Sequence, residues 1–200
     1  YCIVPYVRGR ERSRESREIL AECAALVADG VKEITLLGQN VNSYRADITF
    51  PELLRRVADI PGDFLVRFMT SHPKDVSDDL IRVMSEKREK VAPAFHLPLQ
   101  SGSDRILRAM NRTYTSAHYL GIVDKLRAAI PDITLTSDII VAFPGEEETD
   151  FLDTLRVMER VRYDAVYSFI FSPREGTRAA LMENPTTKEE KNDRMARLLA

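Results

Sequence analysis

The sequence contains little cysteine, little glycine, no tryptophan and no long hydrophobic run. Of its 200 residues, two are cysteine and eight are glycine. Two cysteines cannot build a disulfide framework, so a small disulfide-stapled secreted protein is excluded. An apolar run of about 20 residues, the length that crosses a bilayer, is absent, and so is a signal-like apolar stretch at the first residues. We therefore expect a protein of the reducing cytoplasm, without a membrane partner.

The chain also lacks a surplus of one charge. It has 29 Lys and Arg against 31 Asp and Glu, and 44% of its residues are hydrophobic, enough for one globular domain with a sizeable core. A net charge of −2 gives no global attraction to nucleic acid, so contact with RNA would need a local basic patch. Arginines near the N-terminus could grip phosphate, or could form a solvated loop paired with Glu11 and Glu15. These arginines are Arg8, Arg10, Arg12, Arg14 and Arg17.

Apolar runs typical of strands alternate with amphipathic segments typical of helices. This alternation implies a parallel sheet with right-handed crossovers, either doubly wound or closing toward a barrel, and periodicity does not separate the two. The predicted strands are residues 31–37, 64–69, 94–97, 133–142 and 165–171. The predicted helices are residues 13–28, 50–58, 77–87, 147–160 and 187–200, with further helical segments that begin at Ser103 and Thr115 and end near Pro131.

Several residues predict where the helices begin and end. Gly30 follows the first helix as a stop signal, and Ser77 precedes the third as an N-cap. Thr49 and Glu52 have the spacing of a capping box. Cys23 lies on the apolar face of the first helix with no other ligand type beside it, so we expect a core residue.

Polar and small residues follow the carboxyl end of each predicted strand. In parallel α/β proteins this edge of the sheet is where ligands bind. Any single segment is compatible with an ordinary turn, but five together predict a site. The segments are Gly38-Gln39-Asn40, Thr70-Ser71-His72-Pro73, Gln100-Ser101-Gly102-Ser103, Pro144-Gly145-Glu146 and Ser172-Pro173-Arg174.

Histidines and acidic residues allow a second interpretation, a site of another chemical kind. His72 and His96 could be ligands or bases in an unrelated, cluster-free barrel lyase or isomerase, but no HxH or HExxH spacing accompanies them. Glu146, Glu147 and Glu148 could bind a metal ion. Acidic residues ahead of a helix also suit its dipole without any ion, and we favour that structural interpretation.

The first fourteen residues, YCIVPYVRGRERSR, resemble the segment that closes the CxxxCxxC loop of radical S-adenosylmethionine (SAM) methylthiotransferases of the MiaB type. The resemblance implies that Cys2 is the third cysteine ligand of a 4Fe-4S cluster. The other two would stand three and six residues before Cys2, upstream of this chain, so the chain alone would be inactive. Thiolates suit such a cluster because soft sulfur matches iron-sulfide chemistry.

Four later segments, beginning at Gly38, Arg67, His96 and Ser137, are similar to the same family in the same order. The resemblance implies a partial (β/α)6 radical SAM barrel that lacks its first strand and part of the cluster loop. Residues 1–185 would form this core, and residues 186–200 would begin a helix leading out of the barrel toward a C-terminal RNA-binding domain. A second 4Fe-4S cluster would belong to a preceding N-terminal domain.

The resemblance also assigns cofactor contacts. Gly38, Gln39 and Asn40 match the place that receives the SAM amino group, and Gln100 and Ser101 match the place of ribose contacts. The methionine and adenine parts of SAM would be held by Ser137, Asp138, Ile139 and Phe171. Where this chain has Ala142, the family pattern usually has glycine.

The implied function is addition of a methylthio group to isopentenyladenosine beside the tRNA anticodon. Related branches act on threonylcarbamoyladenosine in tRNA or on a ribosomal protein, and they are the alternatives. The expected partners are tRNA, SAM and an electron donor such as flavodoxin or ferredoxin, and we expect a monomer. No catalytic acid-base side chain is needed, because cluster and SAM carry the chemistry.

Overall fold

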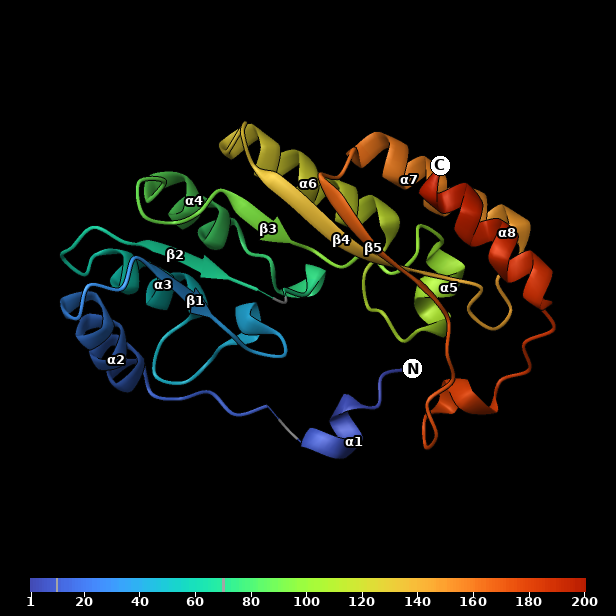
Figure 1. The fold of residues 1–200 in the computed structure, drawn as a ribbon, viewed down its shortest axis with the longest axis horizontal. Coiled ribbons are helices and arrows are strands. Elements are labelled where there is room, and N and C mark those ends of the chain that lie inside the picture. Colours follow the sequence, from blue (N-terminus) through green and yellow to red (C-terminus); the bar gives the residue numbers. More distant parts are fainter. Residues whose placement is uncertain (10, 70) are drawn as a thin grey trace. The chain divides into compact units, whose positions relative to one another are not determined.

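The computed structural model describes residues 1–9, 11–69 and 71–200, and the chain forms two compact units. The predicted positions Arg10 and Thr70 lie outside the described residues. The first unit contains Tyr1–Arg10, Pro98–Val123 and Thr136–Ala200, and the second contains Glu11–Leu97 and Asp124–Leu135. Figure 1 labels the elements along the chain.

The second unit is built on two parallel strands, β1 (Glu33–Leu36) and β2 (Leu65–Phe68). Val91, just before β3 (Ala94–His96), bridges to Val66 in parallel. The rings of Phe50, Phe68 and Phe95 stack edge to face, with centroid separations of 5.2 and 5.4 Å, and form part of the core. The helices are α2 (Ser16–Ala28), α3 (Phe50–Ala58) and α4 (Asp78–Glu86), with 3-10 helices η1 (Val41–Ser43) and η2 (Pro73–Asp75).

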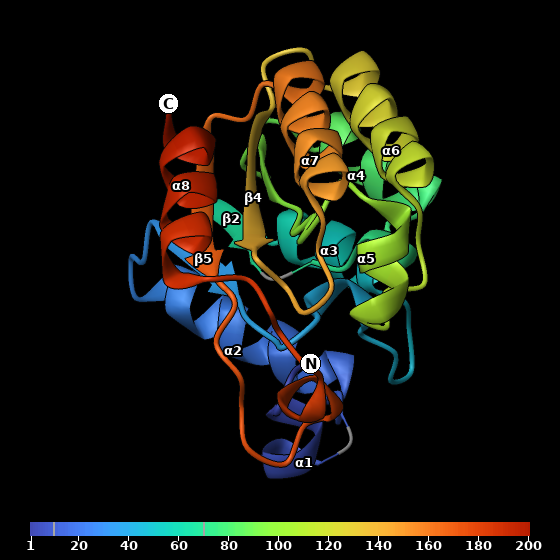
Figure 2. The same cartoon turned by 90° about the vertical axis from the view of Figure 1, so that its right-hand side faces the viewer.

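The first unit is built on β4 (Thr134–Val141) and β5 (Ala165–Ile170), which pair in parallel with Ile139 opposite Ser168. β4 begins in the second unit and continues into the first. The helix α6 (Ser116–Ala129) begins in the first unit and ends in the second. The helix α8 (Lys188–Leu199) packs against β5 (Figure 2). The remaining elements are α1 (Val4–Arg8), α5 (Asp104–Ala109), α7 (Glu148–Val161) and the 3-10 helix η3 (Arg178–Leu181).

Amphipathic spacing explains the helices. In α3 the buried residues Phe50, Leu53, Leu54 and Val57 recur at the three- and four-residue steps of one helix face. In β4 burial alternates residue by residue, as expected of a strand with one covered face.

The structure confirms the five predicted strands, the parallel pairing of β1 with β2 and of β4 with β5, and the α/β class. Within the described residues the strands form two sheets, β1-β2 and β3-β4-β5, and no closed barrel. Cys23 is buried at 3% exposure, as predicted. Ser77 accepts a hydrogen bond from the Leu80 amide, which confirms its role as N-cap.

Two expectations were wrong in detail. Thr49 is the N-cap of α3, but its side chain makes no capping bond, and Glu52 pairs with Arg56 at 2.7 Å. The segment after Cys2 forms the short helix α1 where a loop was expected. Pro5 in its first turn favours helical backbone and Gly9 ends it at φ +72°, but five residues are too few for periodicity to reveal.

Candidate functional site

The predicted site residues fall into both units, and the geometry of each group is set within its own unit. Gly38, Gln39 and Asn40 follow β1 in the second unit. Cys2, Gln100, Ser101, Ser137, Asp138, Ile139 and Phe171 belong to the first unit.

Asn40 has one half of its side-chain amide paired and the other half without a partner. Its Nδ2 donates to Asp75 Oδ2 at 2.7 Å. Its Oδ1 is buried and accepts no hydrogen bond. A Cβ at Gly38 would make ordinary van der Waals contact with the following turn, 3.4 Å from the Cα of Val41. Asn40 Oδ1 is therefore a buried acceptor that lacks a donor.

The loop after β2 is tied to the loop after β1. Asn42 Nδ2 donates to the His72 carbonyl at 3.2 Å, and the His72 amide donates to Asn42 Oδ1 at 2.9 Å. His72 Nδ1 accepts from the Lys74 amide at 3.2 Å, which supports a structural role for this histidine. Ser71, at 4% exposure, has a buried Oγ with no hydrogen-bond partner.

Gln100 is held in a strained backbone conformation beside β4. Its φ is +72°, a region that costs a non-glycine residue free energy. The Gln100 amide donates to the Asp138 carbonyl at 2.8 Å, and the Ile140 amide donates to the Gln100 carbonyl at 2.9 Å. These two bonds fix Gln100 against the strand that carries the other predicted contacts.

Ser101 and Ser137 are fully buried. Ser137 Oγ accepts from the Leu99 amide at 2.9 Å, and Ser101 Oγ accepts from the Ser103 amide at 3.2 Å. Both hydroxyls thus hold the loop that carries Gln100. On β4, Ile139 lies on the buried face, while Asp138 lies on the half-exposed face.

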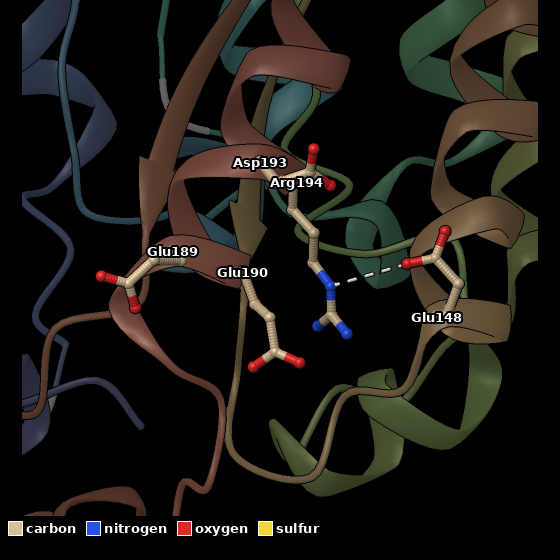
Figure 3. Close-up of a pocket in the computed structure, with 5 residues that line it drawn as sticks. All are labelled: Glu148, Glu189, Glu190, Asp193 and Arg194. Carbon is tan, nitrogen blue, oxygen red and sulfur yellow. Dashed lines mark ion pairs between the residues drawn. The ribbon is translucent and has the colours of Figure 1, made fainter.

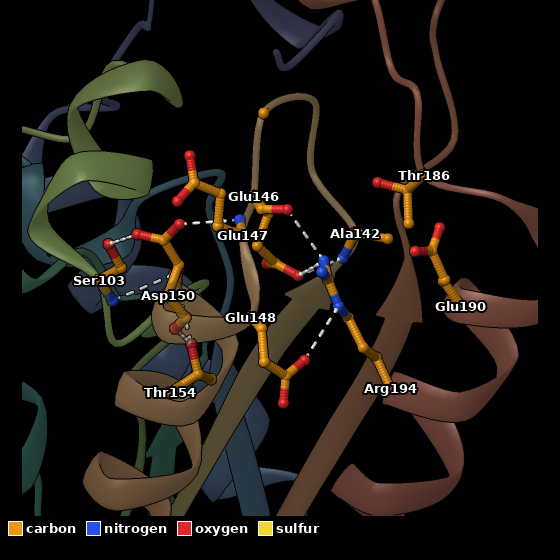
Figure 4. A network of polar contacts seen from close by, with 12 residues as sticks. Ser103, Ala142, Glu146, Glu147, Glu148, Asp150, Thr154, Thr186, Glu190 and Arg194 are labelled. Atoms are coloured by element: carbon orange, nitrogen blue, oxygen red, sulfur yellow. Dashed lines mark hydrogen bonds and ion pairs between the residues drawn. The ribbon is translucent and has the colours of Figure 1, made fainter.

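The same loop is fastened to the start of α7 (Figure 4). Ser103 Oγ donates to Asp150 Oδ1 at 2.6 Å, and the Gly102 amide donates to Thr154 Oγ1 at 2.9 Å. A Cβ on Gly102 would approach the Asp153 carbonyl oxygen to 2.5 Å, so only glycine fits this contact. Burial raises the pKa of the Asp150 carboxyl, but hydrogen bonds from Arg105, Ser103 and the Glu147 amide outweigh it, and the net pKa is lowered.

A second network follows the end of β4. Ala142 has φ +58°, its amide donates to Glu146 Oε1 at 2.9 Å, and its carbonyl accepts from Asn184 Nδ2 at 3.0 Å. Arg194 on α8 donates to Glu146 Oε1 at 2.8 Å. Burial raises the pKa of the Glu146 carboxyl, against the lowering effect of the Ala142 amide and Arg194. This supports a structural role for Glu146.

Cys2 is exposed and its thiol is free. Its neighbour Tyr1 packs edge to face on Phe143 at 6.1 Å, and Phe143 packs on Phe171 at 4.9 Å. The Arg112 guanidinium lies over the Tyr1 ring at 5.3 Å. Sequence reasoning missed Tyr1, Phe143 and Arg112, because residues so far apart in the chain leave no spacing signal.

The basic cluster is arranged differently from the predicted pairing. Arg14 pairs with Glu22 at 2.7 Å and with Glu18 at 3.8 Å, rather than with Glu11 or Glu15. Glu11 accepts a hydrogen bond from Ser43 Oγ at 2.8 Å. The other arginines of the cluster that the structure describes, Arg8, Arg12 and Arg17, are exposed.

A surface pocket between α7 and α8 contains none of the predicted cluster or SAM contacts (Figure 3). Arg194 crosses it toward Glu148, at 3.9 Å, and acidic side chains form the rest of its lining. Within residues 1–9, 11–69 and 71–200, no three His, Cys, Asp or Glu side chains form a metal-binding group, and no helix is long and apolar enough to cross a membrane.

Comparisons with known proteins add the family. Residues 1–158 match the family model described as "Radical SAM superfamily". The chain is 56% identical over 203 residues to the "tRNA-2-methylthio-N(6)-dimethylallyladenosine synthase" of Thermoanaerobacter sp. (strain X514), covering all of this chain and 43% of the relative. The synthase of the same name from Caldicellulosiruptor saccharolyticus is 57% identical with the same coverage. The chain thus spans less than half the length of these relatives.

Solved structures share the fold. Coproporphyrinogen III oxidase (HemN) from Escherichia coli, described as a radical SAM enzyme, matches with a TM-score of 0.68 at 13% identity, over 92% of this chain and 44% of that chain. Methylornithine synthase (PylB) matches with a TM-score of 0.60 at 19% identity, over 95% of this chain and 54% of that chain. At such low identity these matches concern the fold alone.

Proposed function

Because this chain belongs to the radical SAM superfamily, we propose that the complete protein is a methylthiotransferase that modifies isopentenyladenosine, also called dimethylallyladenosine, beside the tRNA anticodon. The observation that carries the proposal is the 56% identity along the entire chain to synthases named for that nucleoside. The segments Arg8 to Arg14 and Gly38 to Tyr44 also resemble this branch more than the branches that act on threonylcarbamoyladenosine or on a ribosomal protein.

The residues present fit SAM and a cluster. Cys2 offers an accessible thiol, the ligand type that a 4Fe-4S cluster needs. The unpaired Asn40 Oδ1 is a suitable acceptor for an ammonium group, and the strained backbone at Gln100 is of a kind that clusters at binding sites. A bound cluster and SAM supply the radical chemistry, and the protein binds, orients and shields the reactants.

Within this proposal most of the cofactor contacts keep the expected roles, and Ser101 and Ser137 take a different one. Asn40 accepts from the amino group, with Gly38 and Gln39 bringing the backbone close. Gln100 contacts the ribose, and Ser101 and Ser137 act by holding its loop, since their hydroxyls are engaged there. Asp138 presents its side chain from the half-exposed face of β4. Ile139, behind it, and Phe171, beside Phe143, complete the surroundings of methionine and adenine.

The proposal also covers the domain organisation and the partners of the complete protein. Residues 1–185 form the radical SAM core and residues 186–200 lead toward an RNA-binding domain, with Arg194 and Leu198 of α8 buried on the core side. Two further cysteines complete the cluster ligands, and a second 4Fe-4S cluster belongs to another domain. The protein acts as a cytoplasmic monomer that receives electrons from a flavodoxin or ferredoxin.

The test is complementation of a strain that lacks its own methylthiotransferase with the complete gene, followed by mass spectrometry of digested tRNA. We expect the methylthio mark on isopentenyladenosine. A mark on threonylcarbamoyladenosine alone, or on a ribosomal protein, would move the chain to another branch. Absence of any SAM cleavage by the reconstituted protein would favour a cluster-free lyase or isomerase.

A further inference from the structure

Two buried oxygen atoms in the second unit have no hydrogen-bond partner, and both follow strands of the same parallel pair. They are Asn40 Oδ1, after β1, and Ser71 Oγ, after β2. Leaving a buried polar group unpaired costs about 1–3 kcal/mol, so such groups are rare in folded proteins and mark places where a partner is expected. An amide oxygen can only accept, and the missing partner of Asn40 is therefore a donor.

The orientation of the Asn40 amide is set by Asp75. An aspartate carboxylate accepts hydrogen bonds and donates none, so the group that faces Asp75 Oδ2 at 2.7 Å must be Nδ2. Oδ1 is consequently turned away from Asp75. The Lys74 ammonium lies 3.9 Å from the same carboxylate oxygen and balances its charge.

The backbone of Asp75 is itself fixed. Its amide donates to the His72 carbonyl at 3.0 Å within η2, and that carbonyl also accepts from Asn42. His72 in turn caps η2 through Nδ1. Asp75 therefore stands on a turn that is tied to the same loop as Asn40, and its carboxylate has little freedom to move away.

We propose that Asp75 is a positioning residue, which holds Asn40 with Oδ1 free to accept a hydrogen bond from the ammonium group of SAM. The inference rests on the proposed function and adds to it a residue that does not touch the cofactor. Rotation of the Asn40 amide by half a turn would present Nδ2 to the ammonium group, and two donors repel. Asp75 excludes that orientation.

The test compares binding of SAM with binding of its analogue that lacks the α-amino group, by equilibrium dialysis with the complete, anaerobically reconstituted protein. In Asp75→Asn the new amide can donate to Asn40 Oδ1 and occupy it. We expect the Kd for SAM to rise about tenfold, the worth of one hydrogen bond to a charged group. The Kd for the analogue should change less than about twofold.

A second variant separates positioning from packing. Asp75→Ala leaves Asn40 unrestrained without blocking it, and should raise the Kd for SAM only about threefold. A purely structural role predicts the reverse order, because alanine removes more contacts than asparagine does. The matched control is Asp47→Asn, since Asp47 accepts from the Ser16 amide at 2.9 Å in the same unit and should leave both Kd values unchanged.

The outcomes are distinct. Equal weakening of both ligands by Asp75→Asn, or no weakening of SAM binding, would overturn the inference while the proposed function stands. Failure of the unaltered protein to bind SAM would overturn both. Selective loss of SAM affinity, greater for asparagine than for alanine, would establish the positioning role.

Discussion

At the scale of single residues, the two cysteines illustrate how environment decides chemistry. Cys2 is exposed and free, whereas Cys23 is 3% exposed in α2. Burial raises the pKa of the Cys23 thiol, which makes the reactive thiolate scarcer. Of the two cysteines, Cys2 alone has a thiol exposed to a ligand.

Cys2→Ala in the complete protein should remove the SAM-binding cluster, because one of three thiolate ligands is missing. Iron analysis and Mössbauer spectra after anaerobic reconstitution measure the effect, and we expect roughly four fewer iron atoms per chain. Cys23→Ala is the control and should keep its iron while losing about 1 kcal/mol of unfolding free energy. Full iron content in Cys2→Ala would refute the assignment.

Ala142 shows that a single methyl group can matter at a special backbone conformation. Its φ of +58° is one that glycine adopts without strain and alanine does not. The glycine that the family pattern usually has at this position is explained by that φ. In this chain three hydrogen bonds hold the turn around Ala142, from its amide to Glu146, from Asn184 to its carbonyl, and from Arg194 to Glu146.

At the scale of elements, α7 organises the loop that carries Gln100. Asp150 and Thr154 lie one turn apart on the helix and receive hydrogen bonds from Ser103 and Gly102 of that loop. Asp150 also completes a capping box with Glu147. One helix start therefore fixes its own first turn and a neighbouring loop.

Asp150→Asn should lower the free energy of unfolding at pH 7 by about 2 kcal/mol, because hydrogen bonds to a buried charge are weakened. Since the folded state lowers the Asp150 pKa below its ordinary 3.8, the carboxylate contributes stability above that pH, and the contribution disappears as the pH falls through the folded-state pKa. Urea unfolding at pH 7 and near pH 3 measures this. The difference between variant and unaltered protein should shrink at the lower pH.

Asp153→Asn is the matched control on the same helix. Asp153 pairs with Arg156 at 2.5 Å in a largely exposed ion pair, and such pairs contribute little. Its replacement should change the free energy of unfolding by less than about 0.5 kcal/mol at both pH values. An equally large loss of stability in the two variants would mean that the Asp150 hydrogen bonds contribute no more to stability than an exposed ion pair does.

At the scale of the whole molecule, a net charge of −2 gives no general attraction to RNA. Arg12 and Arg17 are exposed, and within the described part of the chain neither has an ion-pair partner. By contrast, the Arg82 guanidinium forms ion pairs with the carboxylates of Asp79, at 2.8 Å, and Glu86, at 3.7 Å. Unpaired arginines are the ones available to phosphate.

Replacing Arg12 and Arg17 together by glutamine in the complete protein should weaken tRNA binding and reduce the slope of log K against log salt by about 2, because each arginine would neutralise one phosphate. Filter binding over a range of salt concentrations measures this. Arg82→Gln should leave affinity and slope unchanged. An unchanged slope in the double variant would identify the arginines as a solvated surface.

Much of the fold could be predicted from the sequence. Strand and helix positions follow from local periodicity, which needs only neighbouring residues. The cap at Ser77 and the helix start at Ser103 follow from local hydrogen-bonding preference. The short helix α1 was not predicted, because a few residues carry no period. The pairing of Glu52 with Arg56, in place of a capping box with Thr49, forms only in the folded helix.

The family, the α/β class and the segments that follow strand ends can be read from the amino-acid sequence, since each is encoded in contiguous residues. Which atoms in those segments are hydrogen-bonded and which have no partner depends on the folded chain. That Ser137 holds the loop of Gln100, that Asp150 fastens it, and that Asp75 turns the amide of Asn40 depend on hydrogen bonds between residues 35 to 47 positions apart in the chain. Such bonds form because packing brings distant strand ends together, and no local pattern records them.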